Sequence, residues 1–277
     1  TAQSCVSLWE NGLAMADVSG SDMIDRATLA IAGRALALRG EALFLIRDDS
    51  LVPCSDWDLK TVNAKPTAYR VSVSETGGGT TQTALAGEVL HWRIGCDPVA
   101  PYYGTAPLKR AQLTAGLLNA VETALSEVFD NAPLGTKIVP LPESSSGDVD
   151  GMRSAFKGRR GATLVVEGVA QSTAAGQFPQ SDKRPDDLSP DLSKSMTKET
   201  LSAARDAVSM AFGVLPGLGN AATTGLMVRE AQRHLAQWQL QPIAELMADE
   251  ATEKLGATVR MDLMRPLQAF DAGGRAR

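Results

Sequence analysis

The chain has 277 residues, 44% hydrophobic and only 5% aromatic, and its 27 Lys and Arg against 32 Asp and Glu give a formal net charge of −5. This globular composition favours helices packed through small residues, and the acidic balance excludes a wide basic surface built to bind nucleic acid. Three separated cysteines, Cys5, Cys54 and Cys96, suggest neither a disulfide framework nor a zinc site. The apolar segment 27–46 carries three charges, so it is not expected to span a membrane.

The first 104 residues predict an α+β unit. Residues 21–39 predict a helix whose buried face repeats at three- and four-residue steps through Ile24, Ala27, Ile31, Ala35 and Leu38. Three short segments with alternating apolar residues predict one small antiparallel sheet; they cover 41–48, 68–75 and 87–95. The glycine-rich segment 76–82 is expected to be a hairpin tip.

A long helix is predicted from Pro107 to Asn131 by a steady apolar stripe, made of Leu108, Ala111, Ala115, Leu118, Val121, Leu125 and Val128. Prolines and glycines then break the chain and predict a small insert of mixed structure, with a strand at 163–169. The insert holds a cluster of positive charges, Arg153, Lys157, Arg159 and Arg160. This cluster is either a solvated face or a site for an acidic partner or for phosphates.

Two further helices are predicted on either side of the uncharged segment 211–225. The first starts near 190, ends at Gly213, and has its stripe at Leu201, Ala204, Val208 and Ala211. The second covers 224–255, with Pro242 expected to kink it, and has one face formed by Met227, Ala231, Leu235, Trp238, Leu246 and Leu255. A helix of that length exceeds what one compact subunit buries, so partner subunits are expected to cover it.

Few residues offer catalytic chemistry. His91 lies in a predicted strand and His234 on a predicted helix, and a lone histidine in such a place is far more often a hydrogen-bonded structural residue. The sequence has no nucleophile elbow, no zinc-protease helix and no phosphate-binding loop. We therefore expect no catalytic residue, metal or cofactor. A hydrolase using one of these histidines remains an alternative, as does a helical adaptor of a virion that only binds protein.

Several short motifs, in order, resemble the portal proteins of long-tailed bacteriophages and of the related gene transfer agents. They are Glu88-Val89-Leu90-His91, Tyr103-Gly104-Thr105-Ala106-Pro107-Leu108, Phe212-Gly213-Val214 with Pro216, Leu240-Gln241-Pro242, and Asp271 before Gly-Gly-Arg. Two departures stand out, because the family has Ser where Ala106 lies, and Leu215 is inserted between Val214 and Pro216. The match extends over nearly the whole chain, with its motifs spread across about 180 residues.

The resemblance implies a mainly helical α+β portal fold in a closed ring, usually of twelve subunits. It implies a wing at 1–104, stem helices at 105–131 and 190–213, a clip at 132–189, and a tunnel loop at 214–223. Residues 224–277 would form a long wing helix and a strand leading to a crown that is absent, as in a chain trimmed at both ends.

The resemblance also implies which residues function and what they meet. The tunnel loop residues facing the DNA channel would be Leu215, Pro216, Gly217, Leu218, Gly219 and Asn220, and the basic cluster would lie in the partner-binding clip. The implied partners are other copies of the chain, double-stranded DNA passing without sequence specificity, terminase, a head-tail adaptor and the major capsid protein, with no membrane. The ring would sit at a capsid vertex of the virion after assembly in the bacterial host cytoplasm.

Overall fold

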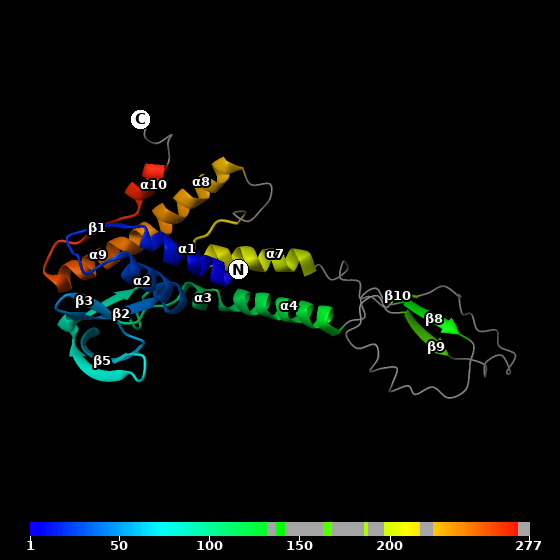
Figure 1. Cartoon of the computed structure of the whole chain (residues 1–277), viewed down its shortest axis with the longest axis horizontal. Coiled ribbons are helices and arrows are strands. Elements are labelled where there is room, and N and C mark those ends of the chain that lie inside the picture. The colour runs from blue at the N-terminus through cyan, green and yellow to red at the C-terminus, as the bar shows by residue number, and fades with distance from the viewer. Residues whose placement is uncertain (132–136, 142–162, 168–185, 188–196, 217–223, 271–277) are drawn as a thin grey trace. The chain divides into compact units, whose positions relative to one another are not determined.

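The computed structural model describes residues 1–131, 137–141, 163–167, 186–187, 197–216 and 224–270 (Figure 1). The chain divides into two compact units, Thr1–Ala115 with Ala204–Arg277, and Gly116–Ala203. The first unit contains the predicted wing, and the second contains the predicted clip. In the part of the chain that is described, no helix is long and apolar enough to cross a membrane.

Two antiparallel three-stranded sheets form the centre of the first unit, where the sequence predicted one. The first has the order β3-β2-β7, with bounds Ser50–Pro53, Glu41–Arg47 and Val89–Arg93. The second has the order β4-β5-β6, with bounds Asp56–Val62, Lys65–Val73 and Thr80–Leu85, and a 3-10 turn η1, Ala86–Glu88, follows it. The single-sheet prediction was wrong because the third predicted segment pairs with the first and not with the second.

Alternation along β2 explains why the sheet is buried on both faces. Leu43 and Leu45 pack against Tyr69 and Val71 of β5, which joins the two sheets in one core. On the other face Phe44 makes an edge-to-face contact with Trp92 of β7. The expected hairpin tip is confirmed, because residues 74–79 connect β5 to β6 and include two glycines at positive φ.

Helices α1, Ala2–Ala14, and α2, Arg26–Arg39, pack against each other beside this core. Helix α1 was not predicted, although its buried residues repeat at helical spacing: Cys5, Val6, Trp9 and Leu13. Helix α2 begins at the cap Asp25, whose side chain accepts from the Thr28 amide, and ends at Gly40 with φ 80°.

The predicted buried face of α2 was wrong. Ile31 and Leu38 are 46% and 48% exposed, and the buried side is instead formed by Thr28, Leu29, Ala32, Gly33, Leu36 and Ala37. The reason is the approach of α1: a Cβ at Gly33 would crowd the backbone at Trp9 and Glu10, so the small-residue face is the one that admits a neighbouring helix. Ile31 and Leu38 are left outside.

The first predicted stem helix is interrupted. It consists of α3, Pro107–Arg110, and α4, Gln112–Asn131, with Ala111 between them in a non-helical conformation. Its predicted stripe is nevertheless confirmed, because those side chains are the less exposed ones, with Leu118 buried. The helix before the predicted tunnel loop is α7, Thr197–Ala211, whose stripe is confirmed with Ala204 and Val208 buried. Its expected start at 190–196 lies outside the described residues.

The long third helix is confirmed as a continuous helical run of three parts: α8, Gly225–His234, a π-helical turn η3, Leu235–Leu240, and α9, Gln241–Leu255. Its predicted face was confirmed at Ala231 and Leu235, which are buried, but was wrong at Met227, Trp238 and Leu246, which are 59%, 68% and 57% exposed. The π-helical turn holds more residues per turn than an α-helix, which rotates the following face. After it the buried residues are Leu240, Ile243, Ala244, Met247, Ala248 and Ala251.

The predicted strand after this helix is confirmed as β11, Arg260–Asp262, which pairs antiparallel with β1, Asp17–Ser19, and is followed by α10, Met264–Phe270. In the second unit β8, Lys137–Leu141, pairs parallel with β9, Thr163–Glu167, which confirms the predicted strand there. Strand β10, Asp186–Asp187, pairs antiparallel with β8. The basic cluster of the predicted clip lies outside the described residues.

Candidate functional site

A buried carboxylate joins the sheets of the first unit to the segment that leads into α3. Glu41, the first residue of β2, is only 7% exposed. Its Oε2 accepts from Trp57 Nε1 at 3.1 Å and lies 3.3 Å from His91 Nε2, while its Oε1 accepts from the Gly104 amide. One side chain thus holds three segments that are far apart in sequence.

The protonation states of this network follow from burial and hydrogen bonding. Burial would raise the pKa of Glu41, but the bonds from His91 and Gly104 outweigh it, so the pKa lies below its usual value. Burial lowers the pKa of His91, which favours the neutral ring. Neutral His91 can donate from Nε2 to Glu41 and accept at Nδ1 from the Tyr69 hydroxyl, 3.0 Å away. The pKa of Tyr69 is raised to about 12, chiefly by burial.

This geometry is closed to outside reactants. His91 is 2% exposed, and both of its ring nitrogens have protein partners. His234 lies half-buried on α8 and belongs to no such network among the described residues. The described ranges also contain no group of three or more His, Cys, Asp or Glu residues that could hold a metal ion. His91 is hydrogen-bonded as expected, and its lack of a catalytic role stays a prediction.

Two glycines let two backbone segments, at Gly40 and at Gly104, cross in close contact next to Glu41. A Cβ on Gly104 would overlap the carbonyl oxygen of Gly40, and Gly40 itself has φ 80°. Ile94 ties the crossing together, since its amide donates to Gly40 O at 2.9 Å and its carbonyl accepts from the Thr105 amide at 2.8 Å. These backbone contacts around Gly104 therefore fix where the chain passes from the sheets of the first unit into α3.

Replacing Gly104 with alanine should lower the free energy of unfolding by about 2–3 kcal/mol, because overpacking against backbone cannot be relieved by a rotamer change. Urea denaturation followed by circular dichroism measures this difference. The control is Gly87→Ala, where a Cβ meets nothing within 4 Å. A loss at Gly104 no larger than at Gly87 would show that the crossing relaxes easily.

The segment before the predicted tunnel loop is anchored on α1. Phe212 is fully buried, its ring packs edge-to-face on Trp9, and its carbonyl accepts from Trp9 Nε1 at 2.9 Å. Gly213, with φ 72°, ends α7 by donating to Met210 O, and the Val214 amide donates to Ser209 O. This is the Schellman arrangement, which needs a residue that accepts positive φ after the helix.

The anchored segment explains the Phe-Gly-Val motif. A Cβ on Gly213 would press on the side chain of Gln239 in η3, and Val214 is buried. Beyond these, Leu215 is half-buried and Pro216 is exposed. The other predicted tunnel loop residues, 217–220, lie outside the described residues, so their role remains a prediction.

The structure brings together one set of residues around Glu41 and another around Trp9, and the sequence motifs contained only some members of each set. The sequence predicted neither Glu41 nor Trp9 as a site residue. Glu41 carried a detectable signal, because a lone carboxylate opens an apolar strand directly after glycine. Trp9 carried a weaker one, as part of the apolar spacing of α1.

The helices and sheets of this chain have the fold of the portal proteins of tailed phages and gene transfer agents. The neck of a native gene transfer agent particle, with C12 symmetry, matches with a TM-score of 0.64 and 17% identity, covering 97% of this chain and 82% of that chain. A HK97 family phage portal protein from Corynebacterium diphtheriae matches with a TM-score of 0.53 and 13% identity, covering 97% and 94%. No family profile and no curated protein matches the sequence. The predicted portal fold is confirmed.

Proposed function

We propose that this chain is a portal protein, which forms a ring at a capsid vertex and provides the channel for packaging and ejection of double-stranded DNA. The observation that carries the proposal is the portal fold, matched over 97% of the chain by subunits of a particle neck with C12 symmetry. Terminase, a head-tail adaptor and the major capsid protein are the proposed partners. The ring would assemble in the host cytoplasm and remain in the virion.

Exposed apolar residues support a ring. On the helices, large side chains face solvent in the single chain, among them Leu113, Leu226, Met227, Trp238 and Leu246, which are 57–91% exposed. Soluble monomers rarely leave so many large apolar side chains uncovered along extended helices. A ring covers such helices with neighbouring subunits through a contact that repeats by rotation.

Charge supports a conduit rather than a DNA clamp. With a net charge of −5 on each chain, a ring of a dozen copies would be strongly acidic. Repulsion between such a ring and DNA phosphates favours sliding over binding. The uncharged residues 215–220 are the proposed tunnel loop, and the cluster at Arg153, Lys157, Arg159 and Arg160 is the proposed docking site for terminase or adaptor.

The proposal includes the absence of an enzyme activity in the chain itself. The enclosed position of His91 supports this, because a general base must lie within hydrogen-bond reach of its substrate. Energy for DNA movement would then come from the motor that docks on the ring.

The test of the proposed function is ring formation by the whole chain. Purified protein over a range of concentrations and salt should give closed rings with a central channel, seen by negative-stain electron microscopy, with a mass that is a whole multiple of the subunit by native mass spectrometry. A chain that stays monomeric under all of these conditions would contradict the portal proposal. In that case capture of a single virion protein in a defined one-to-one complex would favour the adaptor alternative.

A further inference from the structure

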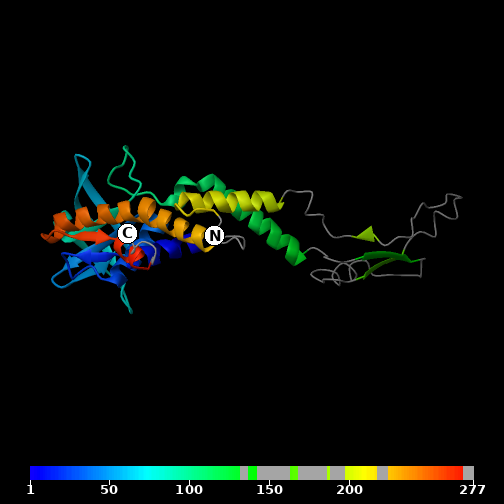
Figure 2. The ribbon, with the colours of Figure 1, turned by 90° about the horizontal axis from the view of Figure 1, so that it is seen from above.

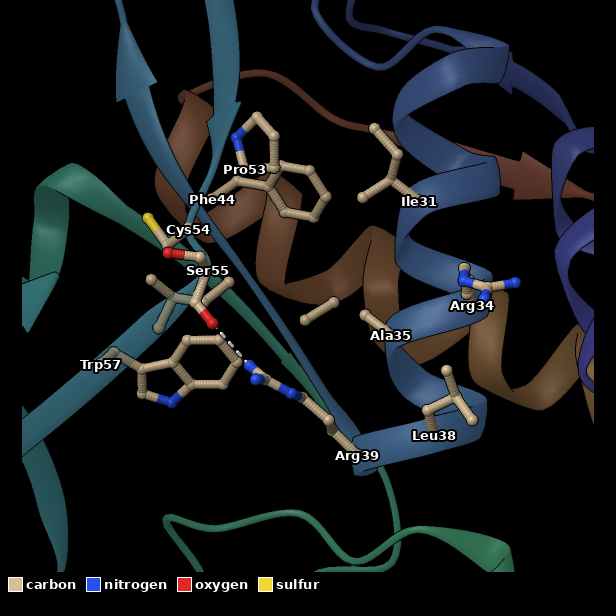
Figure 3. A pocket seen from close by; sticks show the side chains of 12 residues that line it. Ile31, Arg34, Ala35, Leu38, Arg39, Phe44, Pro53, Cys54, Ser55 and Trp57 are labelled. Carbon is tan, nitrogen blue, oxygen red and sulfur yellow. Dashed lines mark hydrogen bonds between the residues drawn. The ribbon is translucent and has the colours of Figure 1, made fainter. Parts of the chain in front are cut away.

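A hollow in the first unit lies between α2 and the first sheet (Figure 3). It is a groove of about 300 Å³ with a mainly apolar lining, in which the principal side chains are Ile31, Ala35, Leu38, Phe44, Pro53 and Trp57. Ile31 and Leu38 are the residues left outside when the small-residue face of α2 packed on α1. Both are nearly half exposed at 46% and 48%, so the groove is an uncovered apolar surface.

The rim of the groove is positively charged. Arg39 is fixed there, because it donates to Ser55 O at 2.8 Å and its guanidinium lies 5.4 Å from the centre of the Trp57 ring (Figure 3). Arg34 contributes a second cation, held only by a 3.5 Å contact with Glu10 on the exposed surface. A complementary surface would therefore be an apolar ridge with acidic neighbours.

Helix α9 carries such a surface. Leu246 projects outward with 57% exposure, and the exposed carboxylates of Glu245, Asp249 and Glu253 lie around it on the same helix. The rotation caused by the π-helical turn places this leucine outside while Met247 beside it is buried. Figure 2 shows α9 along the outside of the wing.

The groove and the α9 ridge are different surfaces of the first unit. The groove is lined by Phe44 of the central strand β2 and by Pro53 of β3, whereas α9 packs on β7, where Trp92 Nε1 donates to Met247 O at 3.0 Å. Two different, complementary surfaces are what a head-to-tail contact between identical subunits requires.

We propose that the α2 groove of one subunit receives the α9 ridge, centred on Leu246, of the next copy of the chain. This inference rests on the proposed ring and names one of its subunit contacts. Leu246 enters the apolar groove beside Ile31 and Leu38, and the acidic residues around it meet Arg34 and Arg39. Charge complementarity sets the orientation, and burial of the leucine supplies most of the affinity.

The test uses one variant on each surface of the full chain, Ile31→Glu in the groove and Leu246→Glu on the ridge. Each introduces a carboxylate into an apolar contact, so each variant alone should weaken association on the order of a hundredfold and stay monomeric where the wild type forms rings. The matched control is Leu85→Glu on β6, a leucine that is 63% exposed outside both surfaces, and it should form rings as the wild type does. Unchanged circular dichroism in all three variants verifies folding.

Mixing the two variants gives the sharper result. The Ile31→Glu chain keeps an intact ridge and the Leu246→Glu chain keeps an intact groove, so an equal mixture should form a dimer with one copy of each and no ring. Sedimentation velocity and native mass spectrometry distinguish this dimer from monomers and rings. Rings in either variant alone, or no dimer in the mixture, would overturn the inference and leave the proposed function intact. A monomeric wild type would overturn both.

Discussion

Replacing Phe212 with alanine should lower the free energy of unfolding by about 3–5 kcal/mol. The ring is fully buried against Trp9, so its removal loses apolar burial and leaves a cavity. Urea denaturation followed by circular dichroism at one protein concentration measures the loss. A fixed concentration is needed because association also stabilises the folded chain.

The matched control for Phe212 is Met210→Ala, two residues earlier in the last turn of α7 but 52% exposed, which should change stability by less than about 1 kcal/mol. Limited proteolysis adds a local measurement, because loosening the anchor should speed cleavage beyond Phe212. Equal losses in the two variants would show that the contact with Trp9 does not hold the end of α7.

Replacing Glu41 with glutamine should cost about 2–3 kcal/mol although it preserves the shape of the side chain. The carboxylate accepts on both oxygens, from Trp57 and His91 on one and from Gly104 on the other. An amide in either orientation turns a donor toward a donor, which leaves buried polar groups unpaired. The control is Glu75→Gln, at an exposed position, where no loss is expected.

The same variant has a predictable pH dependence. Because the pKa of Glu41 is lower in the folded chain than its usual value of 4.5, its ionisation stabilises the fold above that pH. This contribution disappears as the pH falls through the folded pKa. The stability difference between wild type and Glu41→Gln should therefore be constant near neutrality and shrink below about pH 4.5. A difference that persists unchanged in acid would indicate a packing effect and not an ionic one.

The two anchors account physically for two of the motifs by which the sequence resembles portal proteins. Glu41 holds the backbone at Gly104, just before α3, and Trp9 holds the backbone at Phe212, just after α7. Both contacts therefore hold the backbone of the first unit next to the end of a helix.

Local patterns in the sequence predicted features that depend only on residues close together in the chain. The stripe of α4 and the end of α7 at Gly213 were both confirmed, because helical spacing and a glycine cap are local properties. The hairpin tip before β6 was confirmed for the same reason. Strand pairing was not predicted correctly, because alternation identifies a half-buried strand without naming its neighbour.

The candidate site was predictable only in part. The sequence singled out His91, and the expected hydrogen bonding was confirmed. Its partners come from β2 and β5, and spacing in the sequence does not show which strands will be adjacent. The basic cluster at 153–160 and residues 217–220 of the tunnel loop stay predictions.

By itself, the sequence determined the order of the long helices and of strands β2, β5, β7, β9 and β11, the acidic balance, and the short motifs by which the chain resembles the portal proteins. These follow from composition and local periodicity, which act over a few residues. The tertiary structure alone decided which helix faces are covered. The close approach of α1 at Gly33 left Ile31 and Leu38 outside, and the π-helical turn placed Leu246 outside. Burial depends on which element approaches and how closely, and that is a property of the whole fold.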